Sequence, residues 1–317
     1  MTERGDLNIV VVVLNWNGGD ETLQCLRSLR KVRGLVPTRL LADNGSVDGS
    51  VERAKSEDPD LIVVEHGSNL GYAGGNNIAV DHAFKELGAD WVCLVNSDVL
   101  VAADTFDMLL DGARAAEAEG TGPVGAVGPC MLYRDRPEVV WANGGSVGLH
   151  INVTQLIDHN RRNKGGVPHD VDYLPGACLM VTRAAWEATG PLDESFFCYL
   201  EDADWCVRLR ETGQRVVVVP EALAWHGVSI STGGGYSTGR KYMTAVNSVH
   251  FLKKHGSFGG WAALLFFDLL LWPVAFVRGL LTGRARGTLA KLRGVIAGLM
   301  GGRIDASTAA RFARRIP

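Results

Sequence analysis

The feature that most constrains this 317-residue chain is a run of six apolar residues, IVVVVL, at positions 9–14. Five of the six are β-branched, and no polar residue alternates with them, so we expect a strand buried on both faces, as in a parallel sheet. Similar runs follow at 39–43, 61–64 and 91–95, and stretches of helical spacing, the first at 20–30, lie between them. This alternation predicts βαβ units with right-handed crossovers. The first hundred residues are therefore expected to form half of a doubly wound α/β sheet.

The remainder of the chain is less regular. Residues 122–173 contain a polar stretch at 158–170, which we expect to be a loop, and regular structure is expected to resume at Leu174. The further elements that the pattern predicts are strands at 124–127, 139–141, 178–181 and 215–219, and helices at 183–188, 201–211 and 242–253.

Composition excludes several classes of protein. With 46% hydrophobic and 21% charged residues, the chain is too apolar to be disordered, and its 39 glycines follow no collagen-like period. A net charge of −3 argues against a nucleic-acid partner. The six cysteines form no C-x-x-C pair, which predicts buried free thiols in a reducing compartment rather than a disulfide or zinc set. The first apolar run is too short for a signal peptide, so we expect a cytoplasmic protein.

Polar residues follow three of the predicted strands. Asn15 comes after the first, Asp43 after the second, and Asn96 and Asp98 after the fourth. Because ligands of open α/β sheets bind at the carboxyl ends of the strands, these residues predict a site at one edge. Each one alone has a structural explanation: Asp43 suits a turn, and Asp98 suits a helix cap.

Two neighbouring sequence patterns indicate that this site binds a nucleotide and a metal ion. Asn96 and Asp98 place two oxygen ligands two residues apart, which suits a hard divalent cation that takes its other ligands from phosphates and water. The glycine-rich stretch NLGYAGGNN at 69–77 predicts a loop that a nucleotide can approach closely. The sequence contains no P-loop motif, and no G-x-G-x-x-G follows a predicted strand, which argues against P-loop NTPases and nicotinamide enzymes.

The densest acidic cluster is Glu201, Asp202 and Asp204, directly after an apolar segment. Acids at a helix start also suit the helix dipole, but three in four residues exceed that need, and a carboxylate here suits a general base. His226 ends a strand-like segment farther on, where both a structural histidine and a metal ligand are open interpretations.

Taken in order, six segments resemble the family 2 glycosyltransferases, inverting enzymes of the GT-A fold. The segments are VVVLNWNGGDETLQCLRSL at 11–29, ADNGSVDGS at 42–50, NLGYAGGNN at 69–77, LVNSDV at 94–99, LPGACLMVTR at 174–183 and GPLDESFFCYLEDADWCVRLRETG at 190–213. The resemblance covers about residues 8–230 and implies a Rossmann-like, nucleotide-binding mixed sheet flanked by helices.

The resemblance also implies roles for individual residues. Asp43 would hydrogen-bond the base of a nucleotide-sugar donor, and Asp202 would be the catalytic base. Asp98 would be the ligand of a divalent metal, Mg²⁺ or Mn²⁺, in an element matching the family's D-x-D motif, with His226 as a second ligand. Asn96 replaces the first acid of that motif, so the site carries one formal charge fewer, which affects metal affinity and identity. The residues expected to bind the donor besides Asp43 are Asn15, Asn69, Gly71, Asn77, Asn96 and Gly176.

Within the family, the N-x-D variant and the segment LEDADW are most similar to bacterial rhamnosyltransferases of cell-envelope polysaccharide synthesis. This implies transfer from dTDP-rhamnose to a glycan or lipid-linked acceptor. A UDP-sugar-dependent transferase of the same family, a sugar-1-phosphate nucleotidyltransferase and a non-catalytic carbohydrate-binding or scaffold protein are the alternatives. The nucleotidyltransferase is disfavoured because 15–22 contains no basic residue.

We divide the chain into a catalytic domain, 1–230, and a C-terminal extension, 231–317. The catalytic domain has a nucleotide-sugar half, 1–100, and an acceptor half, 101–230. At the start of the extension, the glycine-rich 233–236 predicts a flexible loop that orders over the donor, or a plain linker.

An apolar segment and a basic tail follow in the extension. The segment 259–277 is nearly long enough to span a bilayer, but it contains Asp268 and Pro273. Its tryptophans favour an interfacial helix over a spanning one, and a buried or oligomer-forming helix is the third interpretation. The tail, 278–317, carries nine basic residues and one acid, a net +8, whereas the rest of the chain carries −11. We expect this tail to bind an anionic membrane surface, rather than pack on the acidic body, and to hold the protein at the inner face of the cell membrane.

Overall fold

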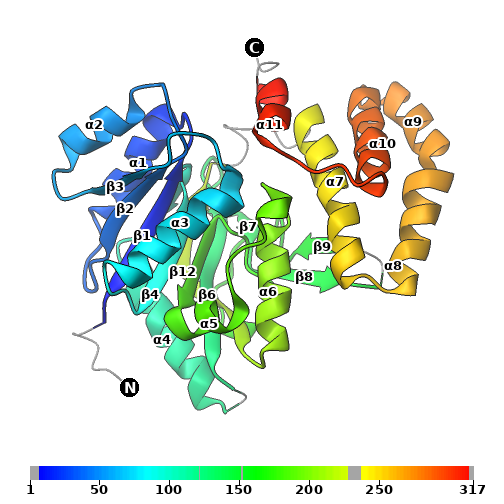
Figure 1. Cartoon of the computed structure of the whole chain (residues 1–317). Helices are drawn as coiled ribbons and strands as arrows, with labels where there is room; N and C mark the ends of the chain where they lie inside the picture. Colours follow the sequence, from blue (N-terminus) through cyan, green and yellow to red (C-terminus); the bar gives the residue numbers. More distant parts are fainter. Residues whose placement is uncertain (1–6, 121, 151–152, 228–236, 314–317) are drawn as a thin grey trace.

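The computed structural model describes residues 7–120, 122–150, 153–227 and 237–313. Within these residues, a ten-stranded mixed sheet forms the centre of the molecule, with helices on both faces (Figure 1). The strands are β1 Ile9–Asn15, β2 Thr38–Asp43, β3 Ile62–Glu65, β4 Trp91–Asn96, β5 Val99–Val101, β6 Val124–Tyr133, β7 Val140–Ala142, β8 Gly145–Gly148, β9 Val153–Leu156, β10 His169–Asp170, β11 Cys178–Thr182 and β12 Arg215–His226. The helices are α1 Gly19–Leu29, α2 Ser50–Glu57, α3 Gly71–Lys85, α4 Thr105–Ala118, α5 Arg183–Thr189, α6 Glu201–Glu211, α7 Thr238–His255, α8 Phe258–Ala263, α9 Trp272–Leu281, α10 Ala285–Leu299 and α11 Ala306–Ala313, and a π-helical segment, Leu264–Leu270, joins α8 to α9.

The strand order is β10-β12-β6-β11-β4-β1-β2-β3, with β5 paired to β12 and β7 to β6. The four strands β3, β2, β1 and β4 are mutually parallel, as the βαβ pattern predicts. Next to them, β11 pairs antiparallel with both β4 and β6. The sheet is therefore mixed, with its parallel half formed by the first hundred residues.

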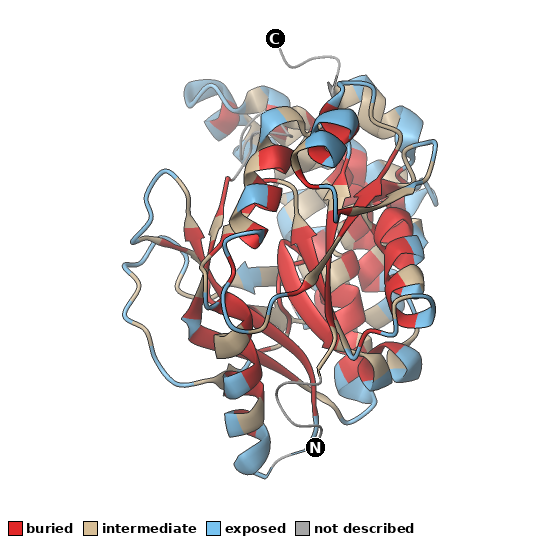
Figure 2. Cartoon of the chain, turned by 90° about the vertical axis from the view of Figure 1, so that its left-hand side faces the viewer, coloured by how far each residue is buried: buried red, intermediate tan, exposed pale blue. Residues whose placement is uncertain are grey.

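Both faces of β1 are buried, which confirms the prediction from its uninterrupted apolar run. Ile9, Val11 and Val13 pack into one core with α1, α2 and α4, whereas Val10 and Val12 pack into the other with α3, α5 and α6. Successive side chains of a strand point to opposite faces, so each face receives alternate valines. Figure 2 shows the central strands as the most buried part of the molecule.

The glycine-rich stretch at 69–77 differs from its prediction as a loop. The structure places its glycines in the first turns of α3, where they permit close packing. A Cβ atom on Gly75 would lie 2.6 Å from Asn44 Oδ1 and from Leu14 Cδ1, and one on Gly71 would lie 2.5 Å from the Phe197 carbonyl oxygen. Glycine is needed at both positions because a side chain would collide with Phe197 at Gly71 and with residues at the ends of β1 and β2 at Gly75.

Other elements were missed or predicted too short. α4, β5 and the two-stranded sheet β8-β9 are absent from the sequence prediction. β12 continues seven residues beyond the predicted strand 215–219, with a register shift between Val219 and Leu223 that accommodates Pro220. This longer strand brings His226 to the same edge of the sheet as Asp98.

The C-terminal helices form a layer beside the sheet (Figure 1). α7 lies nearest the body, α10 packs along α7, and α9 lies on the outside of α10. A small core of its own joins Val249 and Leu252 of α7 to Leu264 and to Val295 of α10. All six cysteines are free thiols, and five of them are buried.

Candidate active site

Asn15 and Asp43 meet at the carboxyl ends of β1 and β2. The register pairs the two residues directly, and Asn15 Nδ2 donates to Asp43 Oδ1 at 2.9 Å. Asp43 Oδ2 accepts the backbone N–H groups of Gly45 and Ser46 at 3.0 and 2.9 Å. Asn15 also binds the hydroxyls of Ser46 and Ser50. These bonds fix the carboxylate, and a carboxylate oxygen retains lone pairs for a further donor.

Asn69 and Gly71 lie where α3 begins, beside the turn after β2. Asn69 Oδ1 accepts the Gly71 N–H at 2.9 Å, and the buried Asn44 donates to the Gly71 carbonyl at 2.9 Å. These contacts bring the predicted donor residues Asn69 and Gly71 to the same edge as Asp43.

Asn77, by contrast, belongs to the packing of the fold. Its amide nitrogen donates to the Leu192 carbonyl at 2.9 Å and to Glu194 Oε1 at 3.0 Å, and its Oδ1 accepts the Leu192 N–H at 2.9 Å. Both amide hydrogens are used in these bonds. We therefore assign Asn77 to holding the segment around residue 192, and its role in binding the donor stays a prediction.

Asp98 and His226 come from neighbouring strands and touch. β5 and β12 pair antiparallel with His226 opposite Val99, and His226 Nε2 lies 3.3 Å from Asp98 Oδ1. Both side chains are buried, and Trp141 packs edge-on against the imidazole with ring centroids 4.3 Å apart. His226 Nδ1 is buried and has no hydrogen-bond partner among the described residues. The carboxylate of Asp98 and the facing Nε2 of His226 are ligand types that fit a divalent cation held between them, whereas Nδ1 is on the other side of the ring.

Within the described chain no group of three or more His, Cys, Asp or Glu side chains is arranged to hold a metal. The pair Asp98 and His226 therefore supplies two ligands at most. A cation at such a site takes its remaining ligands from substrate phosphates and water, which is the usual pattern for Mg²⁺.

Asp202 lies at the N-terminal end of α6, held between two backbone amides. Its Oδ2 accepts the Gly176 N–H and its Oδ1 accepts the Ala203 N–H, both at 2.8 Å. The next residue after Gly176, Ala177, accepts the N–H of Asn96 at 3.0 Å. The predicted base is thus connected, through one short stretch of backbone, to the Asn96–Asp98 element.

Burial raises the pKa of Asp202 above its ordinary value, although the hydrogen bonds from Gly176 and Ala203 oppose the shift. Its neighbour Glu201 is more buried, and burial followed by the charge of Asp202 raises the pKa of Glu201 well above the usual range. Glu201 Oε2 has no hydrogen-bond partner among the described residues. The two adjacent carboxyls titrate as a pair, in which protonation of Glu201 leaves a single charge for Asp202.

We expect Glu201→Gln to stabilise the protein at neutral pH. A carboxyl whose folded pKa is raised favours folding fully only below its unfolded pKa, near 4.5, and this contribution is lost as pH rises toward the folded pKa. The melting temperature of the wild type should therefore fall across that range more than that of Glu201→Gln. Glu211→Gln, at the exposed end of the same helix, is the control. Parallel melting curves for wild type and Glu201→Gln from pH 4 to 8 would contradict the assignment.

The segment before α6 has an unusual backbone. Phe197, Tyr199 and Leu200 adopt φ of 59°, 75° and 72°, a region that is rarely populated by residues other than glycine. Such strain persists only where surrounding contacts determine the conformation. Here Asn247 of α7 provides them, because its Nδ2 donates to the carbonyls of Phe196, Cys198 and Tyr199 at 2.8, 2.7 and 2.9 Å.

Sequence reasoning missed Asn247, since an asparagine inside a predicted helix carries no distinguishing pattern.

A second connection, between α7 and α6, is ionic. Asp204 accepts from Lys254 at 2.8 Å, His255 at 2.7 Å and Arg208 at 2.9 Å. Burial opposes ionisation of Asp204, but these partners outweigh it and lower its pKa. α7 is thereby joined to the N-terminal end of α6, next to Asp202.

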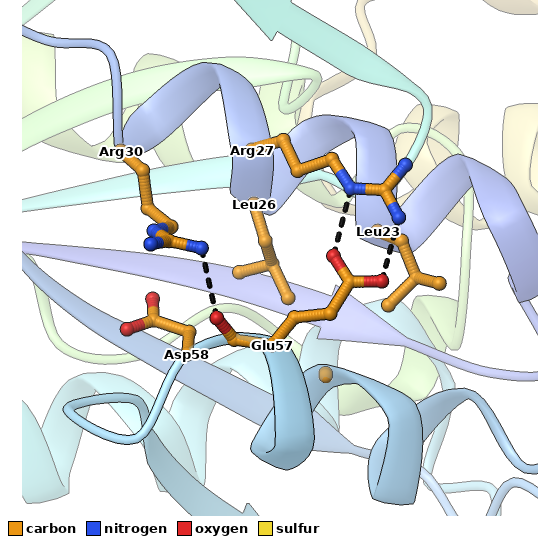
Figure 3. A pocket seen from close by; sticks show the side chains of 7 residues that line it. Leu23, Leu26, Arg27, Arg30, Glu57 and Asp58 are labelled. Atoms are coloured by element: carbon orange, nitrogen blue, oxygen red, sulfur yellow. Dashed lines mark hydrogen bonds and ion pairs between the residues drawn. The ribbon is translucent and has the colours of Figure 1, made fainter.

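A shallow pocket between α1 and α2 is unrelated to these residues (Figure 3). Its polar groups already have partners: Arg27 binds Glu57 through two hydrogen bonds of 2.7 and 2.6 Å, Arg30 binds the Glu57 carbonyl at 2.8 Å, and Asp58 binds Arg39 at 2.7 Å. We interpret the pocket as a gap in helix packing.

The carboxylates of Asp43, Asp98 and Asp202 thus lie along one edge of the central sheet. A family model described as "Glycosyltransferase like family 2" matches residues 7–242. The chain therefore belongs to glycosyltransferase family 2, as the resemblance of its six segments predicts, and it is a glycosyltransferase.

Among curated proteins, the chain is similar to N-acetylglucosaminyl-diphospho-decaprenol L-rhamnosyltransferase of Mycobacterium tuberculosis. The two are 32% identical over 247 residues, which cover 70% of this chain and 77% of that protein. This similarity agrees with the predicted likeness to bacterial rhamnosyltransferases.

Two solved structures share the fold. A mannosyltransferase of Pyrobaculum calidifontis, in complex with GDP-Man and Mn²⁺, has a TM-score of 0.59 at 17% identity and covers 93% of this chain and 87% of its own. GalNAc-T7 with UDP, GalNAc and Mn²⁺ has a TM-score of 0.60 at 12% identity, covering 98% and 58% respectively. At these identities the likeness shows the fold, which is the predicted GT-A fold.

Proposed function

We propose that this protein is an inverting rhamnosyltransferase in which Asp202 is the catalytic base. The observation that supports this most directly is the continuity of one sheet edge. Asp202 binds the Gly176 amide, the adjacent Ala177 binds Asn96, and Asp98, two residues farther on, contacts His226. A base and a metal-binding pair are therefore connected through hydrogen bonds at one sheet edge, which suits a single displacement.

In the proposed reaction, an acceptor hydroxyl attacks the anomeric carbon of the donor sugar. The bond from that carbon to the diphosphate oxygen breaks, and the nucleoside diphosphate leaves. Asp202 takes the hydroxyl proton on a carboxylate oxygen, and its raised pKa makes it a better base than an ordinary aspartate. One displacement with one base inverts the anomeric configuration, whereas a hydrolase uses two flanking carboxylates.

The strand-end residues would hold the donor during this step. Asp43, fixed by Asn15, is placed to accept a hydrogen bond from the base, and Asn69, Gly71, Asn96 and Gly176 line the same edge. Asp98 and His226 would hold a divalent cation, Mg²⁺ or Mn²⁺, which stabilises the negative charge of the leaving diphosphate.

The proposed donor is dTDP-rhamnose and the proposed acceptor is a lipid-linked glycan. The rhamnosyl group and the acceptor follow from the name of the mycobacterial relative, an N-acetylglucosaminyl-diphospho-decaprenol L-rhamnosyltransferase. The dTDP carrier follows from the resemblance to bacterial rhamnosyltransferases. A polyprenol acceptor resides in a membrane, so we place the protein at the cytoplasmic face of the cell membrane, bound peripherally through its C-terminal extension. A UDP-linked sugar is the alternative donor. The segment 233–236, predicted to cover the donor, lies outside the described residues.

A thermal-shift experiment tests the donor and the metal together. Saturating dTDP with Mn²⁺ should raise the melting temperature by about 5 °C, because only ligands of the folded state stabilise it, and the rise should shrink without Mn²⁺. His226→Ala should lose the Mn²⁺-dependent part and keep the rest. His82→Ala, in the last turn of α3, should behave as the wild type.

Each outcome decides between the alternatives. A response to UDP and not to dTDP would exclude the rhamnose donor but keep the transferase. An undiminished Mn²⁺ effect in His226→Ala would refute the metal assignment. A lack of response to either nucleotide would favour the scaffold alternative.

A further inference from the structure

The outer surface of the C-terminal layer is a continuous apolar face on α8, the π-helical segment and α9. Its large apolar side chains are between 48% and 90% exposed. They are Phe258, Leu265, Phe266, Phe267, Leu270, Val274, Val277, Leu280 and Leu281. A soluble monomer rarely exposes so many large apolar side chains in one place, and such patches mark interaction surfaces.

The opposite side of the same helices is packed against the protein. Leu264 is buried in the core shared with α7 and α10. Trp272 stacks on Phe276 and donates from Nε1 to the Thr288 carbonyl at 3.4 Å, and the buried Gly279 lies against α10. The helices are thus held in place by one side, while the other side presents the apolar face outward.

Asp268 is the single charged residue within 259–277, and in the sequence alone it argues against a membrane-spanning helix. In the structure it forms an ion pair with Lys291 of α10. The carboxylate is mostly shielded, with a side-chain exposure of 23%. Because Asp268 is paired on the side of the helix that faces α10, it adds no uncompensated charge to the apolar face.

Positive charge borders this face. Arg278 of α9 and Arg286 and Arg293 of α10 are exposed, and Asp305 is the only acid from residue 278 to 317 of the sequence. Apolar side chains bordered by arginines are complementary to a bilayer surface, where the apolar groups reach the acyl boundary and the arginines reach anionic headgroups.

The geometry favours a helix pair that lies in the plane of the membrane surface over one that crosses the bilayer. Within the described residues, no single helix is long and apolar enough to span a membrane. Phe258–Leu270 and Trp272–Leu281 satisfy the length and composition criteria only together, and they are bent by 48° at the break between them. One side of this pair is also occupied by α7 and α10, so only the outer face is free to meet lipid.

We propose that this outer face docks on an anionic bilayer as an interfacial anchor. The proposal deepens the proposed function, because it supplies the surface on which a lipid-linked acceptor would be met. α7, which carries Asn247 and contacts the segment before Asp202, also packs on α10, so the anchor and the candidate active site belong to one connected layer of helices.

Vesicle co-sedimentation of the full chain tests this proposal. We expect binding to phosphatidylcholine vesicles that contain phosphatidylglycerol, with Phe267→Glu/Leu270→Glu weakening it at least about tenfold. Val36→Glu/Val167→Glu replaces two exposed valines of the body and should bind as the wild type. Arg286→Gln/Arg293→Gln should weaken binding about fivefold per arginine and reduce its salt dependence, unlike Lys31→Gln/Arg33→Gln.

Two outcomes would overturn the proposal. One is vesicle binding that Phe267→Glu/Leu270→Glu leaves unchanged. The other is a wild-type dimer in sedimentation velocity that the same variant dissociates, with no vesicle binding, which would make the face a contact between two copies. Donor turnover is measured on the same protein as release of nucleoside diphosphate with a water-soluble acceptor analogue. This assay needs no membrane, so it tests the proposed enzymatic function separately from the proposed membrane anchor. A protein that binds vesicles but turns over no donor would contradict only the proposed function.

Discussion

Asp202→Asn should reduce kcat by about 10²–10⁴-fold while donor affinity stays near that of the wild type. The replacement keeps the volume of the side chain and one oxygen that can accept from Gly176 or Ala203, but it removes the group that takes the acceptor proton. Asp43 and Asp98, which are assigned to the nucleotide and the metal, are untouched. The loss should therefore appear in turnover and not in nucleotide binding.

Donor turnover and dTDP affinity, measured on the same preparation, check this expectation. Glu201→Gln is the informative comparison, because it changes the neighbouring carboxyl and should retain turnover. The pH profile gives an independent readout. Since Asp202 acts as a base only when ionised, and burial raises its pKa, wild-type kcat/KM should increase with pH through a pKa above that of an ordinary aspartate. Near-normal turnover in Asp202→Asn would refute its role as base.

The sequence predicts the parallel half of the fold well because local patterns determine it. The apolar run at 9–14 specifies a strand buried on both faces, and Asn15 and Asp43 follow strands whose register brings them into direct contact. The pairing of Asp98 with His226 is less local. It depends on β12 continuing past Pro220, which a prediction based on regular apolar runs ends too early.

Two features depended on tertiary contacts and could not be predicted from local pattern. Glycines usually indicate a loop, yet those at 69–77 begin α3, because Gly71 packs against the Phe197 carbonyl and Gly75 against the Asn44 side chain, where a Cβ atom would not fit. The π-helical segment and the ion pair of Asp268 with Lys291 likewise need α10 in place. In each case the deciding partner is remote in sequence.

Asn247 is the clearest such case, and its removal is the second large effect that we expect. Asn247→Ala would leave the carbonyls of Phe196, Cys198 and Tyr199 without their shared donor, in a partly buried segment with three positive-φ residues. An unmet buried carbonyl costs about 1–3 kcal/mol, so we expect a loss of about 2–4 kcal/mol in the free energy of unfolding. The same segment leads into α6 and positions Asp202.

The catalytic consequence of this change should be a fall in kcat of about 10–100-fold with little change in KM for the donor, since a small displacement of a reacting group is costly. Asn247→Asp separates hydrogen bonding from packing. It has the same shape, but an ionised carboxylate cannot donate and would repel the carbonyls, so it should be at least as damaging as alanine. Thr244→Ala on the same helix should leave turnover near that of the wild type. If Asn247→Asp matched the wild type in stability and kcat, the three hydrogen bonds would not position Asp202, and the C-terminal helices would serve the enzyme only through the surface they present.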